Sequence, residues 1–197
     1  MTANSSNVAG FLQPTSTPPV EDLALDTLLQ TIIVGIVGLS GSLVRPRWQN
    51  PPPQQPAITV DWCAVGIIDE DSDDYPKIMH RPAGDGSDEL LRNETISVLA
   101  SFYGPNCRGN AKILRDGIYV AQNRDAIRAA GFEVTLATRL VGAPELVGQQ
   151  WVRRSDLSFT LQRTVSRTFN VFNILSASGQ LTPDSGDVEN WSAPAAT

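Results

Sequence analysis

The spacing of apolar and polar positions along the chain predicts where its helices lie. From Glu21 onward, apolar side chains recur at intervals of three and four residues as far as Ile36. This spacing predicts a first helix that ends near Gly38 or Gly41. Its later half is apolar on nearly every side, so we expect it to be buried in a core or against a neighbouring subunit.

Two shorter helices are expected in the second half of the sequence. Asn106 can cap the first of them, whose apolar side extends from Ala111 to Ala121 at intervals of three and four. Asn123 can cap the next helix, which Gly131 ends.

Several segments have strand-like sequences, rich in β-branched and aromatic residues and bounded by turn residues. They are Cys63–Ile68, Lys77–His80, Glu94–Tyr103 and Phe132–Leu140. The last two alternate between apolar and polar residues, which is typical of a strand with one buried face.

The longest alternation in the chain extends from Leu157 to Val171 and covers 15 residues, apart from Arg163 and Arg167. A single strand of that length would extend roughly 50 Å, about three times a typical strand, and would project from a small domain. Its exposed edge would need a partner chain, because long open edges aggregate. Two strands joined by a bend without a turn signature are the alternative.

Other segments lack the composition of a folded core. Residues 1–20 are rich in Ser, Thr, Asn, Gly and Pro, and the chain after Gln180 is rich in Ser, Ala, Pro and Thr. We therefore expect an extended arm at 1–20, a folded domain at 21–180 and a C-terminal tail at 181–197. Prolines within residues 45–56 predict a stiff, extended strap that is neither a helix nor an inner strand.

The distribution of charge sharpens this picture. The chain has 197 residues, enough for one domain with arms, and a net charge of −6. All 15 basic residues lie between Arg45 and Arg167 together with 15 of the 21 acids, so the excess acids lie towards the two ends. Arginine outnumbers lysine 13 to 2, which suits planar contacts at protein interfaces, although a GC-rich genome explains the same bias. The net acidity argues against a general nucleic-acid binder.

Cysteine usage and hydropathy bear on the compartment. Cys63 and Cys107 form neither a metal motif nor a disulfide scaffold, so we expect two reduced thiols with the role of small apolar residues in an intracellular chain. No basic segment followed by an apolar core opens the sequence, so no secretory signal is expected. The most apolar run, residues 28–39, is too short to cross a bilayer, and no membrane span is expected.

Candidate catalytic and metal-binding groups are sparse. His80, the single histidine, lacks the signatures of a nucleophilic triad, and we expect it in a turn or on the surface. The acidic stretch 69–74 resembles the start of a calcium loop, but Asp74 stands where that loop needs glycine and His80 where it needs glutamate. We expect a solvated acidic loop there, with an incidental divalent ion as the alternative, and no catalytic residue, metal site or cofactor in the chain. Gly84 and Gly86 lack a P-loop lysine, so they give no support for phosphate binding.

Eight short motifs are distributed along most of the chain. They are Arg45-Pro-Arg-Trp-Gln49, Asp61-Trp-Cys-Ala-Val-Gly66, Leu99-Ala-Ser-Phe-Tyr-Gly-Pro105, Leu114-Arg-Asp-Gly117, Gln122-Asn-Arg124, Pro144-Glu-Leu146, Trp151-Val-Arg-Arg-Ser-Asp-Leu157 and Arg163-x-Val-x-Arg-Thr168. In their order and spacing they resemble the neck or tail terminator proteins of tailed bacteriophages, especially contractile-tailed ones. The resemblance covers residues 20–180.

The resemblance implies an α+β fold in which helices flank a mixed sheet. Together with the sequence pattern, it leads us to expect a mainly antiparallel sheet, two or three flanking helices, extended N- and C-terminal arms and a long projecting β-ribbon. It implies a structural virion protein, not an enzyme, which assembles in the host cytoplasm into a ring of itself, expected to be a hexamer. Such a ring would cap the tail tube, stop polymerisation of tube and sheath, and contact the head connector or adaptor proteins. It would leave a channel through which genomic DNA passes without sequence-specific binding.

Contacts with other subunits or partners are expected from segments that carry arginine and tryptophan. The candidate residues are Arg45, Arg47, Trp48, Trp151, Arg153, Arg154, Asp156, Arg163 and Arg167. Acids such as Asp156 or Asp116 could pair across subunits with four of these arginines, Arg153, Arg154, Arg163 and Arg167, and solvated surface charges are the alternative. For Trp48 the alternative is packing in the core.

Two further functions are open at this point. Another head-tail joining protein, such as a stopper, adaptor or collar component, would also act by assembling with other virion proteins, but it would dock on the portal side. A small divalent-dependent hydrolase would use residues 69–74 and His80.

Overall fold

The computed structural model describes residues 4–184, 186 and 188–194 and divides into two compact units. The larger unit comprises Pro18–Pro76 and Arg92–Val165, and the smaller one comprises Met1–Thr17, Lys77–Leu91 and Ser166–Thr197. Strands β4 (Ser87–Tyr103) and β8 (Arg154–Phe169) extend through both units. The predicted boundaries at residues 20 and 180 stay a prediction, and residues 1–3 and 195–197 of the predicted arms lie outside the described residues.

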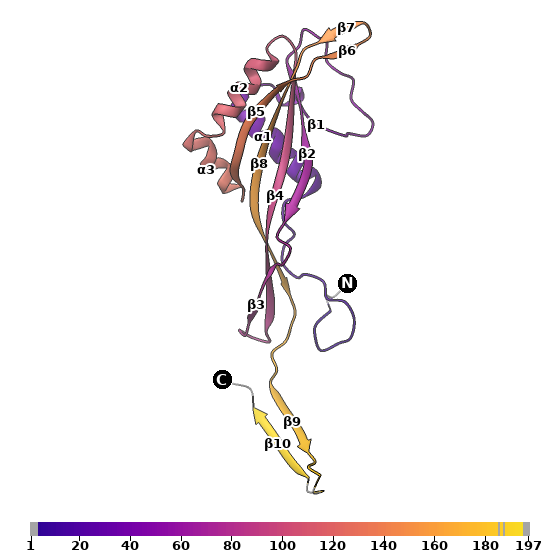
Figure 1. Ribbon diagram of the computed structural model, residues 1–197, viewed down its shortest axis with the longest axis vertical. Coiled ribbons are helices and arrows are strands. Elements are labelled where there is room, and N and C mark those ends of the chain that lie inside the picture. Colours follow the sequence, from indigo (N-terminus) through magenta and orange to yellow (C-terminus); the bar gives the residue numbers. More distant parts are fainter. Residues whose placement is uncertain (1–3, 185, 187, 195–197) are drawn as a thin grey trace. The chain divides into compact units, whose positions relative to one another are not determined.

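The larger unit is organised by a sheet that adds β1 (Val44–Pro46), β2 (Trp62–Ser72) and β5 (Glu133–Gly142) to β4 and β8. The strand order is β1-β2-β4-β8-β5 (Figure 1). β1 is parallel to β2, whereas β2 pairs antiparallel with β4, and β5 with β8. Side-chain hydrogen bonds join Thr95 to Gln162 and Ser101 to Asp156, so β4 and β8 run in opposite directions as well.

The described helices α1 (Asp22–Val37), α2 (Cys107–Gly117) and α3 (Ala121–Ala129) cover one face of this sheet (Figure 1). α1 packs against β1, β2 and α2, whereas α2 and α3 pack against β5. Their buried side chains share one core with alternate residues of the two central strands, which therefore point to the same side: Ile96, Val98, Ala100 and Phe102 of β4, and Leu157, Phe159 and Leu161 of β8. The predicted α+β class with a mixed, mainly antiparallel sheet is confirmed.

Local sequence signals account for several helix ends. Gly38 follows α1 in a left-handed conformation with φ of 79°, as predicted. Asn106 precedes α2 as predicted, but its side chain donates to Asp61, whose other carboxylate oxygen accepts from the Asn106 backbone at 2.8 Å. The predicted cap at Asn123 is wrong, because α3 already begins at Ala121. The Asn123 amide instead donates to Gly117 O at the end of α2.

The long alternation predicted from Leu157 onward is one strand, β8, of 16 residues, so the alternative of two strands is wrong. The expectation that this strand has an unpaired edge is wrong for the larger unit, because β4 and β5 flank β8 there. The ladder with β5 extends from Ser155 to Gln162. Alternation reports which face of a strand is buried, not how many strands lie beside it.

The prediction of a solvated acidic loop at 69–74 is wrong over most of that segment. Residues 69–72 continue β2 and pair with residues 94–97 of β4, after an irregularity that leaves Ile68 without a cross-strand partner. The Asp73 carboxylate then accepts hydrogen bonds from the backbone and side chain of Asn93. Hydrogen bonds to β4 therefore hold this acidic stretch extended despite its repulsion.

In the smaller unit, β3 (Lys77–Arg81) pairs antiparallel with the first residues of β4. Gly84 and Gly86, both with positive φ, lie in the connection between them. His80 is exposed on β3, in agreement with the predicted surface position, and its ring nitrogens lie 2.8 Å from Asp88 and Asn173.

The two ends of the chain are more ordered than their compositions indicate. In the N-terminal arm, Ser6 N donates to Asn170 O and Thr15 N donates to Thr168 O, so the arm lies along the end of β8. At the other end, β9 (Ser176–Leu181) and β10 (Glu189–Pro194) form an antiparallel hairpin, and β10 lies within the segment that was expected to be only a tail.

Candidate functional site

The proline-rich strap, residues 45–56, starts in β1 at the edge of the sheet, and the chain returns to the sheet at Trp62. Arg45 holds this strap in place. Its Nε donates to Ser42 O at 3.0 Å, and its Nη1 donates to Gln54 O at 2.7 Å. The same guanidinium lies 6.0 Å from the centroid of the Trp62 ring. One side chain thus connects the start of the strap, its far end and the sheet.

Trp62 stacks on Tyr103 of β4 beside the strap. Both rings are buried with Val152 in a cluster separate from the main core. Val152 belongs to β7 (Gln150–Val152), which forms a hairpin with β6 (Glu145–Val147). This cluster therefore joins the strap and the β6–β7 hairpin to the same end of the sheet.

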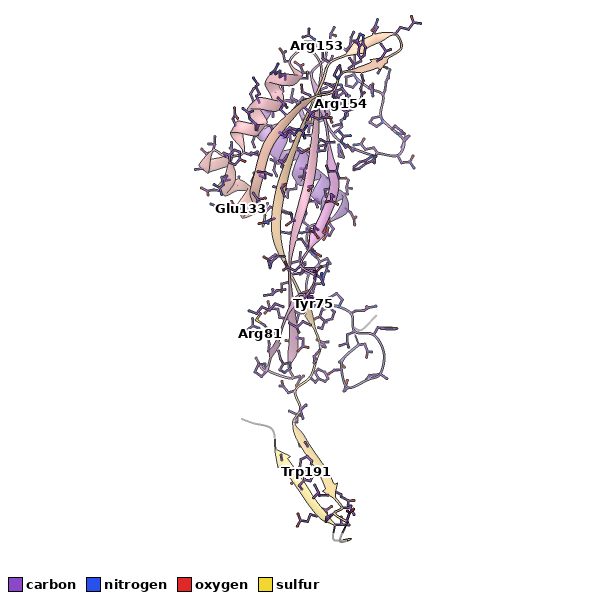
Figure 2. The ribbon with its side chains drawn as sticks, in the orientation of Figure 1. Tyr75, Arg81, Glu133, Arg153, Arg154 and Trp191 are labelled. Atoms are coloured by element: carbon purple, nitrogen blue, oxygen red, sulfur yellow. The ribbon has the colours of Figure 1, made fainter. Side chains whose placement is uncertain are left out.

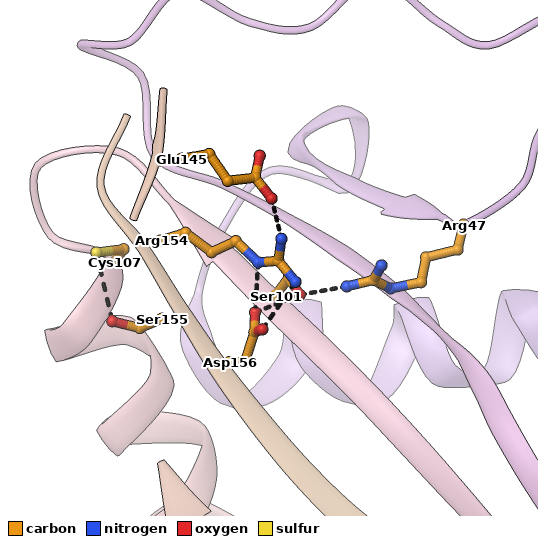
Figure 3. Close-up of polar contacts among 7 residues, drawn as sticks. All are labelled: Arg47, Ser101, Cys107, Glu145, Arg154, Ser155 and Asp156. Atoms are coloured by element: carbon orange, nitrogen blue, oxygen red, sulfur yellow. Dashed lines mark hydrogen bonds and ion pairs between the residues drawn. The ribbon is translucent and has the colours of Figure 1, made fainter. Parts of the chain in front are cut away.

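A series of polar contacts connects the strap to the β6–β7 hairpin (Figure 3). Ser101, fully buried on β4, accepts a hydrogen bond from Arg47 and donates one to Asp156 Oδ1 at 2.5 Å. Arg154 binds both Asp156 oxygens at 2.7 Å and also pairs with Glu145. The hydrogen bonds to Asp156 raise the pKa of the Arg154 guanidinium. Such charge-assisted, bidentate contacts fix the positions of these side chains.

Two tryptophans next to this network face solvent. The exposed fraction of Trp48, on the strap, is 74%, and that of Trp151, on β7, is 69%. Trp48 therefore does not pack in the core, and that alternative is wrong. Leu146, opposite Trp151 in the hairpin, is also exposed. Exposed aromatic side chains on a rigid scaffold are typical of protein interfaces.

Two grooves adjoin the Trp62–Tyr103 stack. One has a volume of about 340 Å³ and is lined by strap residues that include Trp48 and Pro52. The other, of about 380 Å³, lies between Ile58 and Val147 of the hairpin. Both are lined by apolar as well as polar residues and can accept side chains of a partner protein.

Arg163 lies on the helix-covered face of β8, inside the larger unit. Its side chain is 4% exposed and pairs with Glu94 and Glu21 at 2.6 Å each. It also donates to Val20 O at 2.5 Å and lies 5.5 Å from the centroid of the Phe132 ring. Two acids, one from β4 and one before α1, thus neutralise an arginine that interrupts the apolar alternation.

The predicted contact residues therefore lie in different surroundings. Seven of them gather near the β6–β7 end of the sheet, where Figure 2 labels two: Arg45, Arg47, Trp48, Trp151, Arg153, Arg154 and Asp156. Arg163 is interior, and Arg167 is half-buried on the part of β8 that belongs to the smaller unit. The two acids proposed as partners in another subunit pair within the chain, Asp156 with Arg154 and Asp116 with Arg115. The use of these nine residues in contacts with other chains stays a prediction.

Sequence reasoning missed Ser101, Glu145 and the Trp62–Tyr103 stack as parts of this site. One signal was present for Ser101, because it is the single polar residue between Leu99 and Tyr103, in a strand end that is otherwise apolar. A polar residue in such a place needs a hydrogen-bond partner. Nothing in the sequence indicates which residues supply it.

Within the part of the chain that the structure describes, no three His, Cys, Asp or Glu residues gather as a metal site. Cys63 and Cys107 are free and buried, in agreement with the predicted reduced thiols, and burial raises the pKa of the Cys63 thiol. Over residues 4–184, 186 and 188–194, no helix has the length and apolar character needed to span a membrane.

Comparison with known proteins identifies the family. The model of a family described as phage neck terminator protein matches residues 23–185, a segment that contains the whole sheet of the larger unit and the site around Trp62 and Tyr103. No curated protein matches the chain. Because the matched segment covers most of its length, the chain belongs to the phage neck terminator family and is a structural protein of the virion neck.

Proposed function

We propose that the chain is the tail terminator of a contractile-tailed phage and acts by forming a hexameric ring. The ring caps the tail tube, stops further polymerisation of tube and sheath, and joins the tail to the connector or adaptor proteins of the head. Its subunits assemble in the host cytoplasm before they enter the virion. Membership of the neck terminator family supports this proposal.

One structural observation supports the proposal further: Trp48 and Trp151 are exposed on segments that contacts within the chain hold to the sheet. Arg45 holds the strap, the Trp62–Tyr103 stack supports it, and the network around Ser101 connects it to the hairpin. Exposed tryptophans next to grooves are the residues that dominate the binding energy of many protein interfaces.

Within this proposal, the nine predicted contact residues have different roles. Trp48, Trp151 and Arg153 supply the contacting surface, because they are exposed at the β6–β7 end. Arg45, Arg47, Arg154 and Asp156 hold that surface in position through contacts within the chain. Arg163 holds the start of α1 to the sheet, and Arg167 is a proposed contact of the smaller unit.

A central channel follows from the proposed ring, and the net charge of −6 suits it. An acidic lumen would repel phosphates weakly, so DNA would pass without being held.

The experiment that tests the proposal is native mass spectrometry and negative-stain imaging of the purified chain, alone and mixed with the tail tube protein. We expect rings of six subunits, on the tube end at least, and tubes that stop growing once capped. A strictly monomeric chain at high concentration that also forms no ring on the tube would overturn the proposal.

Affinity capture from infected cells separates this function from that of another head-tail joining protein. A tail terminator captures the tail tube protein. A stopper, adaptor or collar component captures portal-side proteins and no tube protein, and that outcome would replace the proposed assignment.

A further inference from the structure

Charge is divided between the helices of the larger unit. α1 carries Asp22 and Asp26 and no basic residue. Most charged residues of α2 and α3 are basic. The basic ones are Arg108, Lys112, Arg115, Arg124 and Arg128, and the acidic ones are Asp116 and Asp125. Because α1 packs on β1 and β2, whereas α2 and α3 pack on β5, the two signs lie towards opposite edges of the sheet.

Basic side chains gather around one cleft at the β5 edge. The cleft has a volume of about 570 Å³ and is lined by Arg108, Lys112 and Arg115 of α2 and by Arg139 of β5; the described lining residues include no acid. Arg115 pairs with Asp116. Within the described chain, Arg108, Lys112 and Arg139 form no ion pair with a carboxylate. A cleft with one sign of charge attracts groups of the opposite sign.

Acidic side chains mark the opposite edge. Asp69, Glu70 and Asp71 are exposed on β2, beyond the point where β1 covers it, because β1 pairs only with Cys63–Val65. Asp22 and Asp26 lie on α1, the helix that packs on β1 and β2. We call this set of five acids the acidic edge, and the four basic side chains around the cleft the basic edge.

Both edges also present backbone and apolar groups that a partner can cover. Among the strands described, β5 has a neighbour on one side only, and so do residues 69–72 of β2. Ile68 beside the acidic edge is 49% exposed, and Leu136 on β5 is 52% exposed. Soluble proteins protect open strand edges by charges, by bulges or by a covering segment, and a neighbouring copy can supply such a cover.

We propose that, in the ring, the acidic edge of one copy binds the basic edge of the next. The inference rests on the proposed ring and names the surfaces that would build it. The two edges lie at opposite ends of the strand order, so each copy uses one edge for each neighbour. Such a head-to-tail contact generates a closed ring when the rotation between copies closes. Opposite charges select this pairing, and like charges oppose contact between identical edges.

A second copy fits the basic edge better than DNA does. The complementary acidic surface is on the same chain, at the position that a head-to-tail contact requires. The net charge of −6 works against binding of a phosphate backbone.

Reversal of charge on each edge tests the inference in the full chain. The basic-edge variant carries Arg108→Glu and Arg139→Glu, and the acidic-edge variant carries Asp69→Lys and Asp71→Lys. All four side chains are exposed, so both variants are expected to fold, which circular dichroism and thermal melting check. Each variant alone should form rings at least about tenfold less readily on tail tubes at low salt. Lys77→Glu with Arg81→Glu, which lowers the net charge as much as the basic-edge variant does but in the smaller unit, should leave ring formation unchanged.

Recovery is the decisive result. An equal mixture of the two variants should form rings that contain both, because each mutated edge then meets a complementary edge of the other variant. A chain with all four substitutions should regain rings for the same reason.

Three outcomes would overturn the inference while the wild-type chain still forms rings. In the first, the basic-edge and acidic-edge variants each assemble as the wild type does. In the second, both variants fold but form rings neither in the mixture nor in the chain with all four substitutions. The third outcome is a basic-edge variant that keeps its rings but loses binding to a DNA duplex. If the wild-type chain forms no ring with or without tube, the proposed function itself fails and the inference fails with it.

Discussion

The Trp62 ring lies face to face on the Tyr103 ring, with the two centroids 4.2 Å apart and the planes inclined by 7°. A guanidinium group lies over each ring: that of Arg45 is 6.0 Å from the Trp62 centroid, and that of Arg154 is 5.8 Å from the Tyr103 centroid. The stack therefore connects the residue that holds the strap to the residue that holds the β6–β7 hairpin. Removal of either ring should loosen both segments.

Truncation of the stack is the first test of this view. Trp62→Ala should lower the free energy of unfolding by about 3–5 kcal/mol, because it removes a buried aromatic ring and leaves a cavity. Tyr103→Phe keeps the ring and should cost far less. Urea unfolding followed by circular dichroism measures both changes. A Trp62→Ala protein as stable as the wild type would show that the stack does not support this end of the sheet.

Gly104 provides a second test of how the strap joins the sheet. Its φ is +100°, and an added Cβ would lie 2.6 Å from Val60 O and from an Asp61 carboxylate oxygen. Gly104→Ala should therefore destabilise the protein by at least about 1 kcal/mol. Gly109→Ala is the matched control, because Gly109 lies within α2 with no atom near its added Cβ. It should stabilise the protein by about 0.5–1 kcal/mol in the same urea experiment. Equal effects of the two substitutions would contradict the account of Gly104.

The sequence predicts single elements well and their neighbours poorly. Alternation from Leu157 locates β8 because a strand with one buried face must repeat every two residues. Whether β4 and β5 lie beside it depends on residues far away in the chain, so the prediction of an unpaired edge was wrong within the larger unit. Residues 69–72 show the same limit, because their acidic composition indicates a loop, whereas pairing with β4 makes them a strand.

The candidate site divides in the same way. Composition marks Arg47 and Trp48 as contact residues, and both lie at the β6–β7 end. Only the structure shows that Arg47 is held by Ser101 and that Trp48 faces solvent, since Ser101 comes from a strand distant in sequence. Arg163 was also predicted as a contact residue. The two glutamates that pair with it inside the larger unit lie far from it in the sequence, so no sequence pattern indicates this pairing.

The Arg163 cluster leads to a third prediction. Glu94→Gln should lower the free energy of unfolding by about 3–5 kcal/mol, because it weakens the pairing of a buried guanidinium. Combined Arg163→Met and Glu94→Leu substitutions remove both buried charges, although Val20 O and the partly exposed Glu21 lose their partner, and should cost less than Glu94→Gln alone. Chemical denaturation of Arg163→Met alone, Glu94→Leu alone and the double variant measures the coupling. Strictly additive changes would show that Arg163 and Glu94 do not stabilise each other.

A fourth prediction concerns pH. Hydrogen bonds from Arg128 and Arg124 lower the pKa of Glu133 from 4.5 to about 2. Since the folded state has the lower pKa, the ionised carboxylate stabilises the fold above pH 4.5, and this contribution is lost as the pH falls from 4.5 towards 2. The difference in unfolding free energy between the wild type and Glu133→Gln should thus be constant above about pH 5 and shrink below it. A difference that does not change between pH 5 and pH 2 would contradict the assigned contacts.

The exposed tryptophans should matter for assembly and not for folding. Trp48→Ala and Trp151→Ala remove side chains that are 74% and 69% exposed, so each should change the free energy of unfolding by less than about 0.5 kcal/mol. The double variant should bind its partner in the proposed neck assembly at least about tenfold more weakly, because exposed tryptophans beside grooves contribute strongly to protein interfaces. Ring formation on tail tubes, scored by negative-stain imaging, measures this loss. Trp191→Ala, which removes the same side chain from the β9–β10 hairpin, is the control and should leave assembly at the wild-type level. If the Trp48 and Trp151 variants assemble normally while Trp191→Ala does not, the contact surface lies in the smaller unit and the assignment to the β6–β7 end is wrong.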